Sequence, residues 1–360
     1  MARVLITRIS SFGDVAMLVP VVYSVAAVYP QDRFIVLTRK AYAPLFENLG
    51  FNVSVKSFDV KRHSSALGFL NLLQSIIRGK FTHVADMHDV LRTKVIRNTL
   101  RFYGKKVAFI DKGRTEKSDM ISNKTLSQPL KSTIVRYQEV LNQLGFPAEM
   151  SYTHLFEFRE HSLYPLRPFV TEKTGNWIGI APFSKHEGKI YPLEKMEKVL
   201  SMLTENPDNR MFLFGSGESE KSVIMHWEKK YKNTKCVSGN LNMEREMLLM
   251  SFLDVMISMD SANMHLASLV EVPVVSVWGA THPYLGFYGF RQDPENAVQI
   301  DLCCRPCSVY GDLPCVREDY ACMHRIQESD IVNKAEKIIS DKRREEEEQK
   351  LREQSEINPE

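Results

Sequence analysis

The chain has 360 residues, of which 44% are hydrophobic and 25% are charged, and its formal net charge is +3. This length exceeds the usual size of one hydrophobic core and predicts two domains. The composition excludes a disordered or fibrous protein, and the weak net charge argues against nucleic acid as a partner.

We expect no signal peptide, because the apolar run between Met1 and Arg8 is too short for one and leads directly into a polar turn. No apolar stretch approaches the roughly 20 residues that cross a bilayer. We therefore expect a cytoplasmic protein, and any contact with a membrane should be peripheral. Basic clusters at 39–40, 61–62 and 92–106 suit an anionic lipid or phosphorylated partner, although charge runs usually face water.

In the first half of the chain, short β-branched runs alternate with amphipathic segments, which predicts a parallel sheet covered by helices. The predicted strands are 4–7, 34–37, 53–56, 82–85 and 107–110. The predicted helices are 16–27, 43–49, 66–77 and 132–144.

An irregular, proline-containing piece then predicts a linker at 161–175, after which the alternation resumes. Strands are predicted at 177–180, 211–214, 255–258 and 274–277, with helices at 193–203, 221–231, 243–253 and 261–269. We expect an α/β protein with two Rossmann-like domains, 1–160 and 176–335, whose parallel sheets face each other across a cleft. We expect residues 336–360 to form a charged helix or a disordered tail. Ligands should bind at the carboxyl ends of the strands.

The turn after the first predicted strand is suited to binding an anion. Ser10, Ser11 and Gly13 lie where a helix begins and leaves backbone N–H groups unpaired. Asp14 lies in the first turn of that helix, where the dipole favours its ionised form, as a general base requires. Asp14 could equally serve only as a helix cap. The turn lacks the G-x-G-x-x-G pattern, which argues against binding of a dinucleotide such as NAD.

The turn after the fourth predicted strand joins carboxylates to basic residues and could hold a phosphorylated sugar. The candidate residues are Asp86, His88, Arg92 and Lys94. Surface pairing between Asp89 and Arg92 explains the pattern equally well.

Three turns of the second half could hold a nucleoside diphosphate. Asp260 or Ser261 can cap the helix that follows a strand, and His265 lies one turn further along. Glu218 could accept hydrogen bonds from a ribose, or could simply place negative charge in the first turn of a helix. A polar loop adds Ser184, Lys185 and Lys189.

These turns resemble those of the heptosyltransferase family of lipopolysaccharide core assembly, which is glycosyltransferase family 9 and has the GT-B fold of two Rossmann-like domains. The matching motifs are Ser-Ser-Phe-Gly-Asp at 10–14, Gly-Lys-Ile-Tyr-Pro at 188–192, Phe-Gly-Ser-Gly-Glu at 214–218, Asp-Ser-Ala-Asn-Met-His-Leu-Ala at 260–267 and Trp-Gly-Ala-Thr-His-Pro at 278–283.

The resemblance implies that Asp14 is the base, that Lys189 binds donor phosphate, and that Asp260, Ser261 and His265 form the donor turn. Thr281, in the last motif, is a further candidate for binding the donor. The family's donor-binding role is assigned to Glu218 less directly, because the loop can also be aligned so that Glu220 takes that position.

The implied reaction is an inverting, metal-independent transfer of heptose from ADP-heptose to a lipid A-linked acceptor in the lipopolysaccharide inner core. The nucleotide sugar is a substrate, and no cofactor is required. Two departures, Ala262 and Asn263, leave the sugar open. Alternatives are transfer of another nucleotide sugar in surface polysaccharide synthesis, and a non-catalytic nucleotide-sugar-binding protein.

Five cysteines lie close together near the end of the second domain. Cys304, Cys307, Cys315 and Cys322 have the number of ligands that a structural zinc ion needs, and a reducing cytoplasm argues against disulfides. Free thiols are the alternative.

Overall fold

A computed structural model describes residues 1–47, 49–124, 126–157 and 161–357 and divides the chain into two compact units. Unit 1 comprises Met1–Ser118, Leu126–Glu157 and Tyr284–Phe290. Unit 2 comprises Asp119–Thr125, Phe158–Pro283 and Arg291–Glu360.

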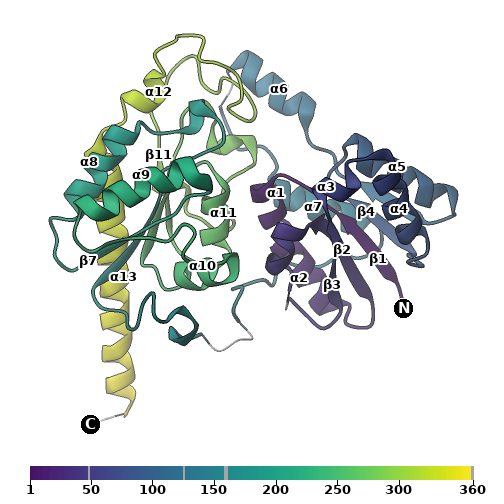
Figure 1. Cartoon of the computed structure of the whole chain (residues 1–360), viewed down its shortest axis with the longest axis horizontal. Helices are drawn as coiled ribbons and strands as arrows, with labels where there is room; N and C mark the ends of the chain where they lie inside the picture. The colour runs from purple at the N-terminus through teal and green to yellow at the C-terminus, as the bar shows by residue number, and fades with distance from the viewer. Residues whose placement is uncertain (48, 125, 158–160, 358–360) are drawn as a thin grey trace. The chain divides into compact units, whose positions relative to one another are not determined.

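Unit 1 contains a five-stranded parallel sheet in the order β3-β2-β1-β4-β5 (Figure 1). Its strands are β1 (Arg3–Thr7), β2 (Arg33–Arg39), β3 (Val53–Phe58), β4 (His83–Asp86) and β5 (Lys106–Phe109). Its helices are α1 (Phe12–Ala16), α2 (Val19–Val28), η1 (Lys40–Leu45), α3 (Val60–His63), α4 (Ala66–Ile77), α5 (Leu91–Phe102) and α7 (Thr133–Gln143), and α6 (Arg114–Asn123) contributes to both units.

Two layers of helices cover the sheet of unit 1. Leu72 and Ile76 of α4 join Ile96 and Leu100 of α5 in one apolar cluster with the strands. Neighbouring side chains of a strand point to opposite faces, so Phe34 faces away from that cluster, and its ring meets the ring of Phe146 just after α7. Both faces of the sheet are therefore buried, as a parallel sheet requires.

Unit 2 contains a six-stranded parallel sheet in the order β11-β10-β9-β6-β7-β8. Its strands are β6 (Asn176–Ala181), β7 (Asn209–Leu213), β8 (Thr234–Cys236), β9 (Val255–Met259), β10 (Val274–Val277) and β11 (Ala297–Val298). Its helices are η2 (Tyr164–Leu166), η3 (Glu187–Lys189), α8 (Leu193–Leu203), α9 (Gly217–Lys230), α10 (Met243–Met250), α11 (Ala262–Ser268), η5 (Pro294–Asn296), α12 (Ala321–His324) and α13 (Glu328–Ile357), and η4 (Pro283–Leu285) lies where the units divide.

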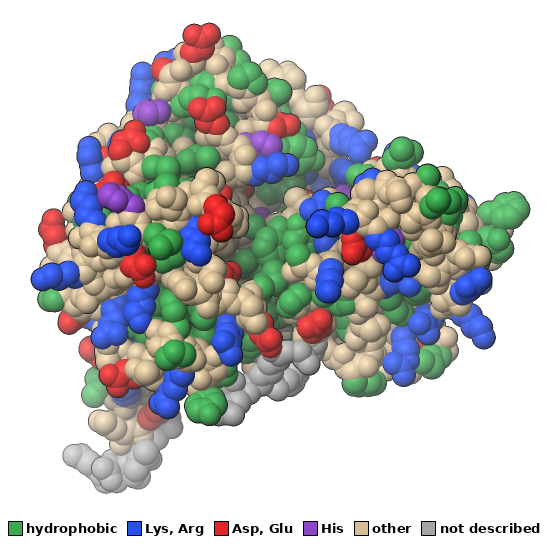
Figure 2. Space-filling view, in the orientation of Figure 1, with side chains coloured by type: hydrophobic (Ala, Val, Ile, Leu, Met, Phe, Trp, Pro, Cys, Tyr) green, Lys and Arg blue, Asp and Glu red, His purple; other side chains and the backbone are tan. Residues whose placement is uncertain are grey.

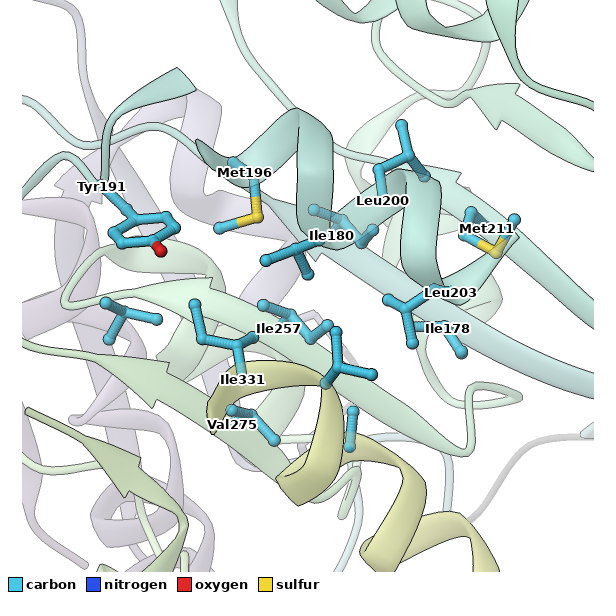
Figure 3. Close-up of a cluster of buried hydrophobic side chains, with 14 of the residues drawn as sticks. Ile178, Ile180, Tyr191, Met196, Leu200, Leu203, Met211, Ile257, Val275 and Ile331 are labelled. Atoms are coloured by element: carbon cyan, nitrogen blue, oxygen red, sulfur yellow. The ribbon is translucent and has the colours of Figure 1, made fainter. Parts of the chain in front are cut away.

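The core of unit 2 explains why the charged C-terminal segment is helical. Ile331, Val332, Ala335 and Ile339 of α13 pack on the same side of the sheet as Met196 and Leu200 of α8 (Figure 3). These residues follow a helical spacing, and most of α13 beyond them is exposed. Burial of one apolar stripe thus anchors a helix whose remaining sequence is almost entirely polar.

The two parallel sheets confirm the predicted α/β class. The helix predicted at 43–49 is wrong, because the chain forms the short 3-10 helix η1 with Pro44 inside it. Proline lacks the N–H that a continuing α-helix needs. The helix predicted at 16–27 corresponds to α2, which begins at Val19, and the separate short helix α1 precedes it.

Candidate active site

Asp14 lies at the carboxyl end of the unit 1 sheet, in α1 directly after β1. One of its carboxylate oxygens is 2.5 Å from the guanidinium group of Arg8 and accepts hydrogen bonds from the backbone N–H and the hydroxyl of Ser11. Arg8 is itself only 6% exposed and donates to the carbonyl of Met87 at 2.7 Å. The carboxylate therefore has both a capping contact within α1 and a cationic partner.

These contacts decide the protonation state of Asp14. Burial of the carboxyl opposes its ionisation, but the charge of Arg8 and the hydrogen bonds from Ser11 outweigh that effect and hold the pKa below its ordinary value. Asp14 is therefore ionised at neutral pH, and the group that ensures this is Arg8. Arg8 belongs to the turn that the sequence singles out, but no spacing rule links it to Asp14, so its role was missed.

The other residues predicted for the acceptor have different positions. His88 lies near Ser10, with its Nε2 atom 3.3 Å from the hydroxyl oxygen, and burial together with the charge of Arg8 lowers the pKa of His88 to about 3. The imidazole is therefore neutral. Gly13 lies in α1 between Ser11 and Asp14.

The prediction that Asp86 contacts the acceptor is not supported by its surroundings. Asp86 is 0% exposed. Its carboxylate accepts hydrogen bonds from the Thr7 hydroxyl and from the backbone N–H groups of His88 and Asp89, and it forms an ion pair with Arg97 at 3.0 Å. These internal contacts use both carboxylate oxygens, so Asp86 holds the turn in place.

Arg92 and Lys94 lie at the start of α5 and leave their charges accessible. Arg92 is exposed, with its guanidinium carbon 5.9 Å from the centroid of the Phe58 ring. Lys94 is half-buried and lies 3.6 Å from Asp89. Asp89 pairs with Lys94, Arg97 and Arg114, so the alternative pairing of Asp89 with Arg92 is not the one that forms.

Lys117 is a cation near this site that the sequence did not single out. It is 4% exposed, and its ammonium group lies 4.0 Å from the centroid of the Phe287 ring. Burial and the charge of Arg136 lower the pKa of Lys117 to about 8, while Asp14 acts in the opposite direction. A buried cation next to a candidate base is typical of a site that binds an anion.

In unit 2, Asp260 lies at the centre of a compact polar cluster at the carboxyl end of β9. Its carboxylate is 2.7 Å from the ammonium group of Lys189 and accepts a hydrogen bond of 2.6 Å from the Thr281 hydroxyl. The Ser184 hydroxyl donates to the Asp260 carbonyl at 3.4 Å. Four residues predicted from three separate turns thus meet at one point.

Ser261 and His265 belong to the helix that follows this cluster. Ser261 is the N-cap of α11, but its hydroxyl lies 3.3 Å from that of Ser258 and makes no capping hydrogen bond. His265 is 6% exposed within α11. Lys185 is exposed in the same loop as Ser184.

Glu218 stands apart from the cluster. It is exposed in the first turn of α9, whereas Glu220 accepts a hydrogen bond of 2.6 Å from the backbone N–H of Ser216. The structure thus gives Glu220 a local role in the loop and leaves the carboxylate of Glu218 facing solvent.

The backbones of the two loops that carry Lys189 and Thr281 are in close contact. The N–H of Ala280 donates to the carbonyl of Gly188 at 2.8 Å. A Cβ atom at Gly279 would lie 2.6 Å from that same carbonyl oxygen, and one at Gly188 would lie 2.8 Å from the Cβ of Ala280. Glycine at both positions is therefore required for this approach.

Arg305 holds the second of these loops by its backbone. It is 2% exposed, and its guanidinium group donates to the carbonyls of Gly279, at 2.5 Å, and Thr281, at 2.9 Å. The N–H of Cys307 donates to the carbonyl between them, that of Ala280, at 2.7 Å. Three consecutive carbonyls are thus bound by the cysteine-rich segment, which positions Thr281 against Asp260.

The cysteines do not form the predicted ligand group. Within the described ranges, no cluster of three or more His, Cys, Asp or Glu side chains could hold a metal ion. All six cysteines are free thiols, and burial raises the pKa of Cys322 to about 11. The zinc site predicted at Cys304, Cys307, Cys315 and Cys322 is therefore not found, and Arg305 provides the visible structural role of this segment.

Two Rossmann-like units with polar turns at the carboxyl ends of their strands are the GT-B fold. The family model of glycosyltransferase family 9 (heptosyltransferase) matches residues 69–313, and the chain belongs to this family.

Curated relatives and a solved structure agree with this assignment. The chain is 20% identical over 336 residues to lipooligosaccharide heptosyltransferase 2 of Campylobacter jejuni, covering 91% of this chain and 95% of that one. It is 21% identical over 282 residues to the lipopolysaccharide core heptosyltransferase OpsX of Haemophilus influenzae, covering 77% and 79%. The structure of ADP-heptose lps heptosyltransferase II from E. coli matches with a TM-score of 0.70 and 14% identity, covering 95% of this chain and 100% of that chain.

Proposed function

We propose that this glycosyltransferase moves heptose from ADP-heptose to a lipid A-linked acceptor of the lipopolysaccharide inner core, with inversion at the anomeric carbon. The observation that carries the donor half is the cluster of Lys189, Asp260 and Thr281 at a strand end of unit 2. The names of the relatives, which are heptosyltransferases of lipopolysaccharide or lipooligosaccharide, support the sugar and the acceptor.

In the proposed reaction, Asp14 accepts the proton of the acceptor hydroxyl as that oxygen attacks the anomeric carbon. The bond from that carbon to the diphosphate breaks at the same time, through an oxocarbenium-like state. Arg8 keeps Asp14 ionised, and the resulting low basicity suits a step in which the developing positive charge on the sugar acidifies the attacking hydroxyl.

The departing diphosphate is stabilised by Lys189, by the hydroxyl of Ser184 and by the backbone N–H groups after Asp260. This cationic environment supports a reaction that proceeds without a divalent metal and without a cofactor. Activity that persists in a metal chelator is the expected result, and activity restored only by adding a metal would contradict this part of the proposal.

The direct test is release of ADP from ADP-heptose in the presence of a truncated lipopolysaccharide acceptor, comparing the native chain with Asp14→Ala. We expect release that depends on the acceptor and falls at least a hundredfold in the variant. Turnover of a UDP or GDP sugar instead would retain the mechanism but replace the heptose, for which Ala262 and Asn263 are the residues to examine. Nucleotide binding without any turnover, unchanged in Asp14→Ala, would identify a non-catalytic binding protein.

A lipid-linked acceptor places the proposed reaction at the cytoplasmic face of the inner membrane. Among the described residues, no helix has the length and apolar character to cross a bilayer. The proposed contact with the membrane is therefore peripheral.

A further inference from the structure

The outer surface of α3, α4 and α5 exposes large apolar side chains that take no part in the core of unit 1. On α5, Leu91 is 78% exposed, Val95 38% and Phe102 88%. On α4, Leu67 is 77% exposed and Leu70 57%. Spacings of three, four and seven residues place the members of each helix on one side, facing away from the sheet that Leu72 and Ile96 cover.

The same surface carries an excess of positive charge, although Asp86 and Asp89, between its two basic stretches, pair with Lys94 and Arg97. From 60 to 85 and from 90 to 110 the sequence contains ten Lys and Arg residues and no Asp or Glu, although the whole chain has a net charge of only +3. Arg78 and Arg101 are among the exposed cations. In Figure 2, hydrophobic and basic side chains lie interspersed over this part of unit 1.

We propose that the outer surface of α3, α4 and α5 docks on an anionic lipid bilayer. This inference deepens the proposed function, because it rests on an acceptor that is anchored in a membrane, and it assigns the surface that reaches that membrane. Exposed leucine and phenylalanine insert between headgroups, while arginine and lysine bind the anionic headgroups around them.

Charge and chemistry favour a bilayer over the other occupants. A second copy of the chain would bring two surfaces of the same sign together, which opposes a symmetric dimer. Nucleic acid would be bound by the cations but would gain nothing from exposed leucines. Only an anionic bilayer offers partners to both kinds of side chain.

The surface also lies where docking would serve the proposed reaction. Helices α3 and α5 each begin just beyond the carboxyl end of a strand, at the edge of the sheet where β1 leads into Asp14. Leu91 and Val60 are therefore at the end of the surface nearest to the candidate base, and an acceptor headgroup held there would be close to the bilayer.

The experiment is co-sedimentation of the full chain with phosphatidylcholine vesicles that contain or lack phosphatidylglycerol, at low and high salt. One variant combines Leu67→Ser, Leu70→Ser and Phe102→Ser, and a second combines Arg78→Gln and Arg101→Gln. The matched control, Lys350→Gln with Leu351→Ser, removes an exposed cation and an exposed leucine from α13. None of these residues belongs to the candidate active site.

We expect the native chain and the α13 control to bind the anionic vesicles, and binding to weaken with salt. Each of the two surface variants should bind roughly tenfold more weakly. The first loses apolar area that the bilayer would bury, and the second loses cations that are attracted to anionic lipid. ADP release with a water-soluble, delipidated acceptor should be unchanged in both, which also shows that they are folded.

Equal binding to neutral and anionic vesicles, or native binding by both variants, would overturn the inference. A dimer that the surface variants dissociate, or nucleic acid that they release, would replace it with another partner. Normal ADP release from the soluble acceptor without vesicle binding would reject this surface alone. Vesicle binding without any ADP release would reject the proposed function and leave the docking surface in place.

Discussion

The ammonium group of Lys189 lies 2.7 Å from a carboxylate oxygen of Asp260, and the two residues come from turns that are far apart in the sequence. The pair places a cation at the strand end where the donor diphosphate is proposed to bind. Lys189→Met should raise the KM for the donor about tenfold or more, because a charge-assisted hydrogen bond contributes about 1.5–3 kcal/mol. Lys229→Met, which removes an exposed lysine from α9, is the control. An unchanged donor KM in Lys189→Met would place the diphosphate elsewhere.

Removing Arg8 should shift the pH dependence of the reaction. Asp14 is active when ionised, and its lowered pKa keeps that form present as the pH falls below 3.8. In Arg8→Met, burial of Asp14 would no longer be offset by a cation, so its pKa should rise and the acid limb of kcat/KM should move to higher pH. Rate profiles that run from neutral pH down through the acid limb of the native protein test this. Identical acid limbs would show that another group controls the protonation of the base.

The ion pair between Arg8 and Asp14 should also make the stability of unit 1 depend on pH. A carboxyl group whose pKa is lower in the folded state than in the unfolded state stabilises the fold at pH values above its unfolded pKa. This stabilisation is lost as the pH falls through its folded pKa. Native unit 1 should therefore lose stability in acid more steeply than Arg8→Met, as urea unfolding at several pH values would show.

Asp86→Asn should damage the fold of unit 1, because Asp86 holds its turn from within. The change removes the fully buried partner of Arg97, which keeps its ion pair with Asp89 at 2.9 Å, so the cost should be that of a lost charge-assisted hydrogen bond, about 1.5–3 kcal/mol. The free energy of unfolding should fall by that order, and KM for the acceptor should change only in proportion to the loss of folded protein. A stable variant with a specific increase in acceptor KM would restore the acceptor role.

Lys117 should reduce the stability of the protein at neutral pH. Its pKa falls from 10.5 to about 8 on folding, which corresponds to a cost on the order of 3 kcal/mol for the charged form. The cost is complete below the folded pKa and disappears as the pH rises from about 8 to 10.5. Lys117→Met should therefore unfold at higher urea concentration at pH 7, and its advantage should shrink above pH 8. A less stable variant would mean that the contact with Phe287 outweighs the cost of burial.

Arg305 should act as a positioning residue for the donor loop. Arg305→Met leaves the carbonyls of Gly279 and Thr281 without a donor, and each buried unpaired group costs about 1–3 kcal/mol. We expect a higher donor KM, a smaller change in kcat and no change in acceptor KM. Arg305→Lys, which keeps the charge but not the branched set of donors, should recover only part of the loss. Equal damage to donor and acceptor kinetics would indicate general unfolding instead.

The sequence patterns predicted the strands well and the contacts between turns poorly. The five strands of unit 1 all lie where β-branched runs alternate with helices, because burial on both faces demands an almost continuous apolar run. The short edge strands β8 and β11 were missed, since two or three residues carry no detectable period. Helix α6 was missed because its sequence is mostly polar.

The candidate site shows the same division. Turns at strand ends identified Asp14, Lys189 and Asp260, since the fold gathers such turns at one edge of each sheet. The roles of two arginines became visible only in the structure. Arg8 contacts Asp14 across a tight turn, and Arg305 contacts carbonyls more than twenty residues away in the sequence. Helical and strand periodicity contains no information about such pairs.

The binding of Gly279, Ala280 and Thr281 through their carbonyls has a consequence for how donor specificity can evolve. A loop fixed by its backbone keeps its path when a side chain changes, except where a glycine is required for close approach. Ala280 has little room for a larger side chain, because it is 5% exposed and its Cβ packs against Gly188, so a change of donor would fall on the Thr281 side chain while the loop remained anchored to Arg305 and Cys307. One scaffold could in this way serve several nucleotide sugars through few substitutions.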